Sequence, residues 1–198
     1  NGFISKDTRK KLAGLAFENT AYYESLISSW FNKDNTAICE TNSSIPLKKI
    51  KDLRYGENPH QSGAYYKYGN NKLSQINGKS LSFNNIYDLE SAVELSYEFE
   101  KNSCVIVKHG NPCGVALDNI QHKAYKKALT CDKTSAFGGV VAFNQEVNEK
   151  TATQIAKIFT EIVIAPDFST KAKDLLSKKK NLILIKYKKT KKQKKFHI

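Results

Sequence analysis

Residues 104–107 read Cys-Val-Ile-Val, a short run in which every side chain is apolar. A strand without polar alternation is typical of a sheet that is covered on both faces. Three further apolar runs follow along the chain, at 140–143, 162–164 and 182–185. Segments with helical spacing separate them, and strands that alternate with helices indicate a layered α/β sheet.

The helical segments are recognised by apolar residues that recur every three or four positions. They predict helices at 88–101, at about 120–130, and at 151–159 and 172–179. The aromatic run 63–68 predicts another strand. Further out, residues 8–31 predict an amphipathic helix that Asp7 or Thr8 can cap. Residues 32–49 are polar and aperiodic, which predicts a linker.

The composition is that of a globular protein that can form its own core. Of 198 residues, 40% are hydrophobic and 26% are charged, so we expect one domain with a short appendage. No run approaches the roughly 20 apolar residues of a membrane span, and the N-terminus lacks a signal-peptide pattern. We expect a cytoplasmic location without a membrane partner. The chain contains no methionine, which indicates that it was cut from a longer protein.

The net charge of +13 is concentrated at one end of the chain. Twelve lysines and one aspartate lie in 171–198, which leaves a net charge of about +2 for the preceding residues. A near-neutral body with a lysine-rich end is typical of a solvated terminal segment, so no nucleic-acid partner is expected. The alternative is a noncatalytic module that binds a polyanion through this lysine-rich end.

The four cysteines, Cys39, Cys104, Cys113 and Cys131, show no metal-binding or disulfide pattern. No Cys-x-x-Cys pair occurs, and no pair of histidines stands nearby at zinc-finger spacing. We expect reduced thiols and no metal.

Three loops hold more special residues than folding alone requires, and each lies next to a predicted strand. The first reads Arg-Tyr-Gly-Glu-Asn-Pro-His-Gln from Arg54 to Gln61. It is either a polar turn or a site that uses Arg54, one of two arginines in a lysine-rich chain. The planar guanidinium of Arg54 can grip a phosphate or carboxylate at two points.

The second loop, 108–114, follows the buried strand and begins with Lys108 and His109. A surface Lys-His pair can be without function, but here the turn would hold both side chains at the edge of the sheet. Together they supply a cation and a group that titrates near neutrality, as proton transfer and oxyanion stabilisation require. Cys113 has no activating neighbour, which favours a small buried thiol over a nucleophile.

The third loop, 132–139, ends in Gly138 and Gly139 before a predicted strand. Adjacent glycines allow a ligand to approach the backbone closely and expose amide donors. Taken alone, the loop fits a plain turn equally well.

Together these loops resemble the bifunctional family that joins AICAR transformylase to IMP cyclohydrolase. The motifs occur in the order of that family: RYGENPHQ at 54–61, FNNIYDL at 83–89, VKHGNPCGVA at 107–116, DKTSAFGGVVAFN at 132–144 and EIVIAP at 161–166.

The resemblance implies a cytidine-deaminase-like α/β/α layered subdomain preceded by a helix and a linker. It implies that 1–34 are the last helix of the cyclohydrolase domain and its joint, that 35–49 are the linker, and that 50–198 are a truncated first transformylase subdomain. Zinc deaminases carry Pro-Cys-x-x-Cys, whereas Ala116 stands where the second cysteine would be. No metal is therefore expected.

The resemblance implies formyl transfer from the cosubstrate 10-formyltetrahydrofolate to the 5-amino group of AICAR, in a protein that is a homodimer when full length and also closes formyl-AICAR to IMP. His109 would then assist proton removal from the amine, and Lys108 would stabilise the oxyanion or protonate the leaving nitrogen; which group carries each proton stays open. The nucleotide-binding positions of the family fall on Arg54, Tyr55, Asn85, Phe137, Gly138 and Glu161.

Overall fold

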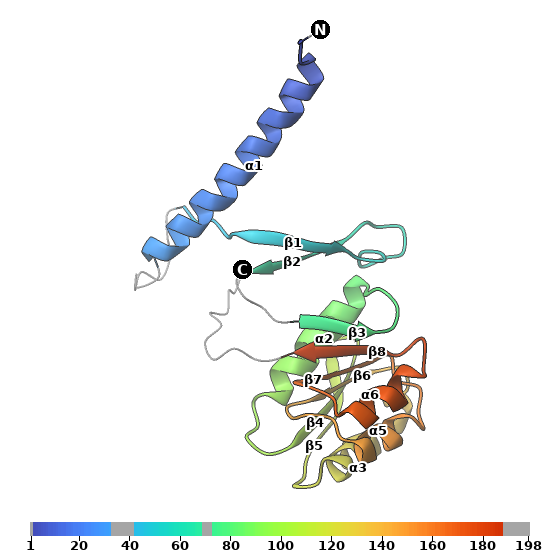
Figure 1. Ribbon diagram of the computed structural model, residues 1–198. Helices are drawn as coiled ribbons and strands as arrows, with labels where there is room; N and C mark the ends of the chain where they lie inside the picture. Colours follow the sequence, from blue (N-terminus) through green and yellow to red (C-terminus); the bar gives the residue numbers. More distant parts are fainter. Residues whose placement is uncertain (1, 33–41, 69–72, 188–198) are drawn as a thin grey trace. The chain divides into compact units, whose positions relative to one another are not determined.

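The computed structural model describes residues 2–32, 42–68 and 73–187 (Figure 1). The chain divides into two compact units, one formed by 1–51 with 65–71 and the other by 52–64 with 72–198. The elements run in the order α1 (Lys6–Phe31), β1 (Leu47–Asp52), β2 (Ala64–Tyr68), β3 (Leu73–Asn77), α2 (Phe83–Ser96), β4 (Ser103–Lys108), β5 (Asn111–Leu117), α3 (Gln121–Cys131), α4 (Lys133–Ala136), β6 (Val140–Phe143), α5 (Glu149–Ile155), β7 (Ile162–Ala165), α6 (Thr170–Ser177) and β8 (Ile183–Tyr187).

The first unit contains the predicted N-terminal helix, which is confirmed as α1. Ser5 caps this helix, since its side-chain oxygen accepts a hydrogen bond from the Thr8 amide at 3.1 Å. None of the α1 residues is buried. Strands β1 and β2 pair as a two-stranded sheet. The first of them begins at Leu47, inside the stretch predicted as a linker.

The second unit is built on a mixed sheet, which confirms the α/β class. Within the described residues, six strands lie in the order β3-β8-β7-β6-β4-β5. Strands β6, β7 and β8 are parallel to one another. Strand β4 runs antiparallel to both β5 and β6, and β3 runs antiparallel to β8.

Alternate side chains of β4 enter two separate cores, as expected for a strand covered on both faces. Cys104 and Ile106 pack with buried residues of α3, α5 and α6 on one face of the sheet. Val105 and Val107 pack with buried residues of α2 on the opposite face. The ribbon shows the same arrangement, with α2 on one side of the sheet and α3, α5 and α6 on the other (Figure 1).

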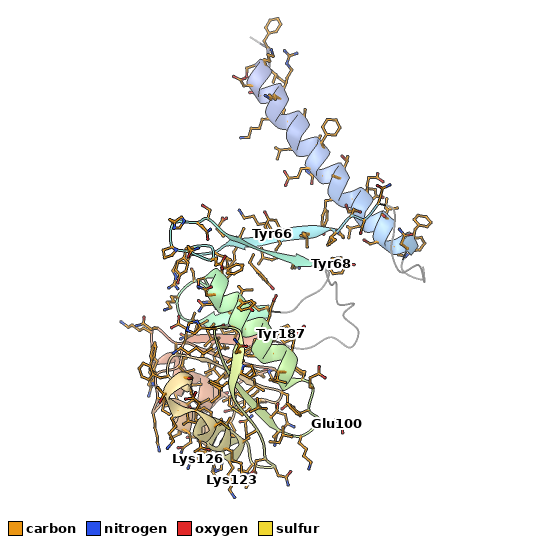
Figure 2. The ribbon with its side chains drawn as sticks, turned by 180° about the vertical axis from the view of Figure 1, so that it is seen from behind. Tyr66, Tyr68, Glu100, Lys123, Lys126 and Tyr187 are labelled. Carbon is orange, nitrogen blue, oxygen red and sulfur yellow. The ribbon has the colours of Figure 1, made fainter. Side chains whose placement is uncertain are left out.

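Helix α3 shows how the charged residues are kept out of these cores. Its buried positions include Ala124, Tyr125 and Ala128, while Lys123 and Lys126 are exposed on its outer side (Figure 2). The helical spacing read from the sequence therefore matches the buried face of this helix.

Further predicted segments differ in the structure, among them the third loop, 132–139, which contains the short helix α4. The helix predicted at 88–101 spans Phe83–Ser96 instead, because Ser82 and Asn85 form a capping box at its start. The second loop, predicted over 108–114, is mostly strand: β5 begins at Asn111, so that only His109 and Gly110 form the turn.

The lysine-rich end is also only partly a terminal segment. Residues 170–187 form α6 and β8, in which Leu176 and the run 183–185 are buried. The interpretation of 171–198 as a solvated segment is therefore wrong for its first part. Residues 188–198 lie outside the described residues, as does Cys39; Cys104, Cys113 and Cys131 carry free thiols.

Candidate functional site

Three loops with predicted site residues meet at one edge of the sheet. Val107 near the end of β4 pairs with Val140 at the start of β6, and Val140 pairs with Ile162 at the start of β7. Lys108 therefore lies at the same edge as the loop before β6, which holds Phe137 and Gly138, and as Glu161 before β7. Strand β4 runs antiparallel to β6, so the end of β4 lies beside the start of β6. The loops therefore lie at the end of the sheet where the parallel strands begin.

His109 lies at the tip of the hairpin between β4 and β5. Lys108 pairs with Asn111, so His109 and Gly110 are the two central residues of the turn. Their φ angles are 53° and 74°, and a type I′ turn requires positive values at both positions. Histidine adopts this left-handed conformation more readily than most residues. Its imidazole is exposed.

Two hydrogen bonds hold the backbone of this tip. The Gly110 amide donates to Oδ1 of Asp88 at 2.6 Å, and Nδ2 of Asn111 donates to the His109 carbonyl at 3.1 Å. A Cβ on Gly110 would lie 2.2 Å from Cε1 of Tyr87. The tip is therefore fixed by residues of α2 and β5, while the imidazole stays accessible.

Lys108 links the hairpin to the third loop. Its Nζ donates to the Phe137 carbonyl at 2.7 Å. Gly138 has a φ of 72°, and its amide donates to the Phe159 carbonyl at 2.8 Å. The rings of Phe137 and Phe159 lie 5.3 Å apart. Phe137 nevertheless remains 57% exposed, which leaves an aromatic face at the edge of the sheet.

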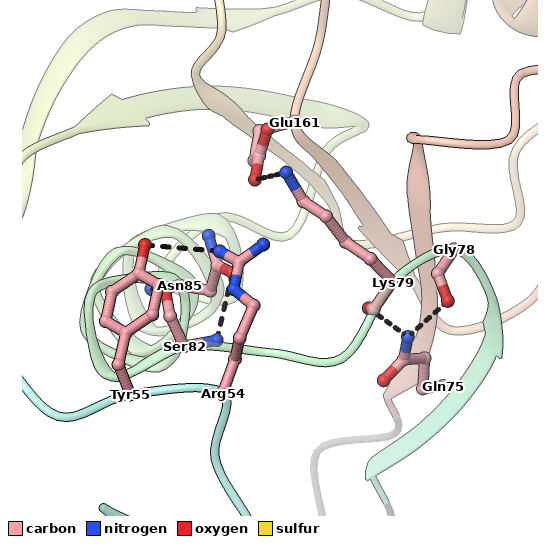
Figure 3. Close-up of polar contacts among 8 residues, drawn as sticks. All are labelled: Arg54, Tyr55, Gln75, Gly78, Lys79, Ser82, Asn85 and Glu161. Atoms are coloured by element: carbon pink, nitrogen blue, oxygen red, sulfur yellow. Dashed lines mark hydrogen bonds and ion pairs between the residues drawn. The ribbon is translucent and has the colours of Figure 1, made fainter. Parts of the chain in front are cut away.

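Arg54 and Tyr55 are anchored to the start of α2. The Arg54 amide donates to the Leu81 carbonyl at 3.0 Å, and the Phe83 amide donates to the Tyr55 carbonyl at 3.3 Å. The Arg54 guanidinium lies over the Tyr55 ring, 4.8 Å from its centroid. Its Nη2 donates to the Tyr55 hydroxyl at 3.2 Å (Figure 3). Arg54 is exposed, so its fork can still reach an anion.

Asn85, a predicted nucleotide-binding residue, is buried and takes part in the fold. Its side-chain Oδ1 accepts from the backbone amide of Ser82 at 3.1 Å, and its backbone amide donates to Oγ of Ser82 at 3.3 Å (Figure 3). These are the two bonds of a capping box. The amide oxygen of Asn85 is therefore already used at the N-terminus of α2.

Glu161 pairs with Lys79, a residue that the sequence analysis did not single out. Lys79 Nζ lies 2.8 Å from Oε1 of Glu161, whose side chain is 18% exposed. Nε2 of Gln75 donates to the carbonyls of Gly78 at 3.1 Å and Lys79 at 2.7 Å (Figure 3). Neither Gln75 nor Lys79 lies in a periodic segment or a recognised motif, so only the folded structure shows the ion pair of Lys79 with Glu161.

A shallow hollow of about 430 Å³ lies beside the hairpin tip. The first loop, the start of α2 and the tip line it, through Glu57, Phe83, Asn84, Tyr87, Asp88 and His109. Asp88 lies within the motif FNNIYDL, which is the only signal in the sequence that could have drawn attention to it.

The cysteine of the hairpin is not set up as a nucleophile. Burial raises the pKa of the Cys113 thiol, which disfavours the reactive thiolate. The sulfur donates to the Ile106 carbonyl at 3.5 Å. Among residues 2–32, 42–68 and 73–187, no cluster of three His, Cys, Asp or Glu could hold a metal ion. No helix in that part of the chain is both long and apolar enough to cross a membrane.

Comparisons with known proteins give close sequence relatives. The bifunctional purine biosynthesis proteins PurH of Persephonella marina, Caldicellulosiruptor saccharolyticus and Clostridium botulinum strain Kyoto are 48%, 45% and 46% identical to this chain. Each alignment covers 94% of this chain but 38% of the relative. The chain thus spans well under half the length of these relatives.

One solved structure gives a weaker match. A Desulfotalea psychrophila protein, proposed as a formate dehydrogenase accessory protein, overlaps 60% of this chain and 54% of its own, with a TM-score of 0.43 and 16% identity. A similarity at this level supports no argument about fold or function.

The sequence profile of one family extends over the whole chain. It is described as the AICARFT/IMPCHase bienzyme and matches residues 1–198. Together with the identity to the PurH proteins, this match includes every loop at the candidate site. The chain belongs to the AICARFT/IMPCHase bienzyme family.

Proposed function

We propose that this chain supplies part of a site that transfers the formyl group of 10-formyltetrahydrofolate to the 5-amino group of AICAR. The observation that carries the proposal is the linkage of two loops by Lys108. Its ammonium binds the Phe137 carbonyl, and it immediately precedes the exposed His109. Lys108 therefore links the hairpin that carries His109 to the loop that carries Phe137, within a family named for this activity.

The reaction needs a base and an oxyanion partner. The amine nitrogen of AICAR attacks the formyl carbon, negative charge develops on the formyl oxygen, and the bond from that carbon to N10 of the folate then breaks. His109 takes the proton that the amine loses. An ammonium has three donors, so Lys108 can bind Phe137 and still stabilise the oxyanion or protonate N10.

The nucleotide is held by the surrounding residues. Arg54, stacked on Tyr55, binds an anionic group of AICAR through its fork. Phe137 offers a ring face, and the positive φ of Gly138 permits close approach of the backbone. Glu161 accepts hydrogen bonds from the substrate. Asn85 contributes through its side-chain NH2 group, because its Oδ1 already accepts from Ser82.

The remaining assignments follow from the same family. Residues 50–198 are the first transformylase subdomain, with a cytidine-deaminase-like fold that carries no metal. Residues 1–34 are the last helix of the cyclohydrolase domain with its joint, and 35–49 connect the two. The intact protein is a cytoplasmic homodimer that also closes formyl-AICAR to IMP. We do not favour polyanion binding, since two lysines of the basic end, Lys171 and Lys186, pair with Glu149 and Asp167.

The test is His109→Ala in the intact protein that carries this chain. Loss of a proton-transfer group should lower kcat by about 10²- to 10⁴-fold and change the affinity for AICAR little. Release of tetrahydrofolate gives kcat, and calorimetric titration gives the affinity. His122→Ala, on α3, is the matched control and should retain the parental kcat. A parental rate in His109→Ala would remove His109 from the mechanism.

A further inference from the structure

The backbone of the hairpin tip is bound by a partner from outside the hairpin. His109 has a φ of 53°, in a region that costs a non-glycine residue free energy unless the surroundings hold it there. The hydrogen bonds between β4 and β5 end at Lys108 and Asn111. The amide that follows His109, that of Gly110, is thus outside the ladder, and it is bound by a residue from another element.

That residue is Asp88, which lies one and a half turns into α2. Its Oδ1 accepts the Gly110 amide proton at an N to O distance of 2.6 Å. A bond from a backbone amide to a carboxylate is charge-assisted, and such bonds are stronger than neutral ones. Helix α2 is in turn fixed by its capping box and by the burial of Leu89 and Val93 against the sheet. Asp88 therefore ties the tip to a rigid element.

The ring of the neighbouring Tyr87 lies close to Gly110. A Cβ on Gly110 would lie 2.2 Å from Cε1 of this ring, so the glycine has no room to move toward α2. The tip is thus held at the Gly110 amide by Asp88 and confined by Tyr87. The imidazole of His109 is left exposed, and it lines the same hollow as Asp88 and Tyr87.

We propose that Asp88 is a positioning residue for His109: through the Gly110 amide it holds the hairpin tip in the left-handed conformation that aims the imidazole into the hollow. The inference rests on the proposed role of His109 in formyl transfer. Positioning matters for the rate because misplacement of a reacting group by about 1 Å can lower the rate roughly 100-fold. Binding of the nucleotide by Arg54 on the first loop does not pass through this bond.

Three variants of the intact protein separate position from charge. Asp88→Asn keeps an acceptor oxygen at the same place and removes the charge. Asp88→Glu keeps the charge and moves the oxygens by one methylene. Asp88→Ala removes both. We expect kcat to fall by up to about 100-fold in the Glu and Ala variants, with KM for AICAR nearly unchanged, and Asp88→Asn to keep most of the parental kcat.

Asp118→Ala is the matched control. Asp118 also accepts a backbone amide proton through Oδ1, from Ile120 at 2.9 Å, but lies at the opposite end of β5. It should lower stability without changing kcat. Hydrogen exchange provides a readout independent of activity: the Gly110 amide should be protected in the parent and in Asp88→Asn, and should exchange rapidly in Asp88→Ala.

The outcomes are distinct. If Asp88→Ala fails to fold, the other two variants decide. A positioning role predicts a higher kcat in Asp88→Asn than in Asp88→Glu, whereas a role for the charge predicts the reverse order. A parental kcat in Asp88→Glu and Asp88→Ala, or a change in KM alone, would overturn the inference. If His109→Ala itself keeps the parental kcat, the proposed role of His109 in formyl transfer fails instead, whatever the Asp88 variants do.

Discussion

At the scale of single residues, the buried phenol of Tyr125 makes stability depend on alkaline pH. The ring is 2% exposed, and burial raises the pKa of Tyr125 to about 12. The unfolded chain releases this proton near pH 10. A raised pKa stabilises the fold fully below pH 10, and this contribution is lost as pH rises from about 10 to about 12.

We therefore expect Tyr125→Phe to remove that part of the pH dependence. Relative to the variant, the parent should lose about 1.4 kcal/mol of unfolding free energy between pH 8 and pH 11, because its unfolded state alone is ionised there. Urea denaturation at both pH values measures the difference. Tyr66→Phe, at an exposed ring (Figure 2), provides the reference. A constant difference between Tyr125→Phe and the parent would contradict the prediction.

A second expectation at this scale concerns Gly114, where β5 meets α3. A Cβ there would lie 2.1 Å from the Ala128 carbonyl oxygen, which belongs to the helix backbone and cannot rotate away. Gly114→Ala should lower the free energy of unfolding by about 1–3 kcal/mol, the usual range for overpacking. Gly14→Ala is the control, since no atom lies within 4 Å of its Cβ, and in a helix it should be neutral or stabilising. Equal unfolding midpoints for the two variants would disprove this account.

At the scale of elements, the capping box is what sets the start of α2. Ser82→Ala removes the side-chain acceptor of the Asn85 amide and should cost about 1 kcal/mol. Ser82→Thr keeps that acceptor and should restore most of the loss. Thermal denaturation followed by circular dichroism measures both. Unchanged stability in Ser82→Ala would show that packing against the sheet alone defines this end of the helix.

The same helix shows why some boundaries could not be read from the sequence. Periodicity located the buried residues Leu89, Ala92 and Val93, because burial on one face produces it. It could not place the start, since Asn85 completes the box where a glutamate or glutamine is usual. Strand β5 was missed because Pro112 and Gly114 interrupt a strand pattern; an edge position tolerates a proline.

Strand β3 was missed for another reason. It is a short edge strand of mixed polarity whose partner, β8, lies more than a hundred residues later in the chain. No local pattern encodes such a pairing. The core strands β4, β6, β7 and β8 were found because their residues are almost all buried, which makes them apolar without alternation.

At the scale of the whole molecule, the candidate groups lie at an open edge. Arg54 and His109 are exposed, and Phe137 is 57% exposed. Such an edge does not exclude water or fix a folate. We expect the purified 198-residue chain to bind no folate tightly and to show no formyl transfer when tetrahydrofolate release is followed. The intact protein is the positive control. Turnover by the chain alone at a comparable rate would refute this expectation.

The sequence indicates the individual loops of the candidate site but not that they lie together. It singled out the loops of Lys108 and Phe137 separately, because each has an unusual composition. Their meeting depends on the antiparallel pairing of β4 with β6, which brings the end of one strand to the start of the other. Lys79 and Asp88 contact residues from other segments, Glu161 and Gly110, and of the two only Asp88 lies in a motif that the sequence shows.

The position of β8 between β7 and β3 has a consequence for synthesis on the ribosome. All four residues of β7 are buried, yet one edge of β7 has no partner until β8 has emerged. At about 5–20 residues per second, that apolar edge stays open for roughly a second or more in each nascent chain. Neighbouring chains on one polysome could pair through it during this interval. Slower translation of residues 166–187 should therefore increase aggregation of newly made protein without altering the stability of the finished fold.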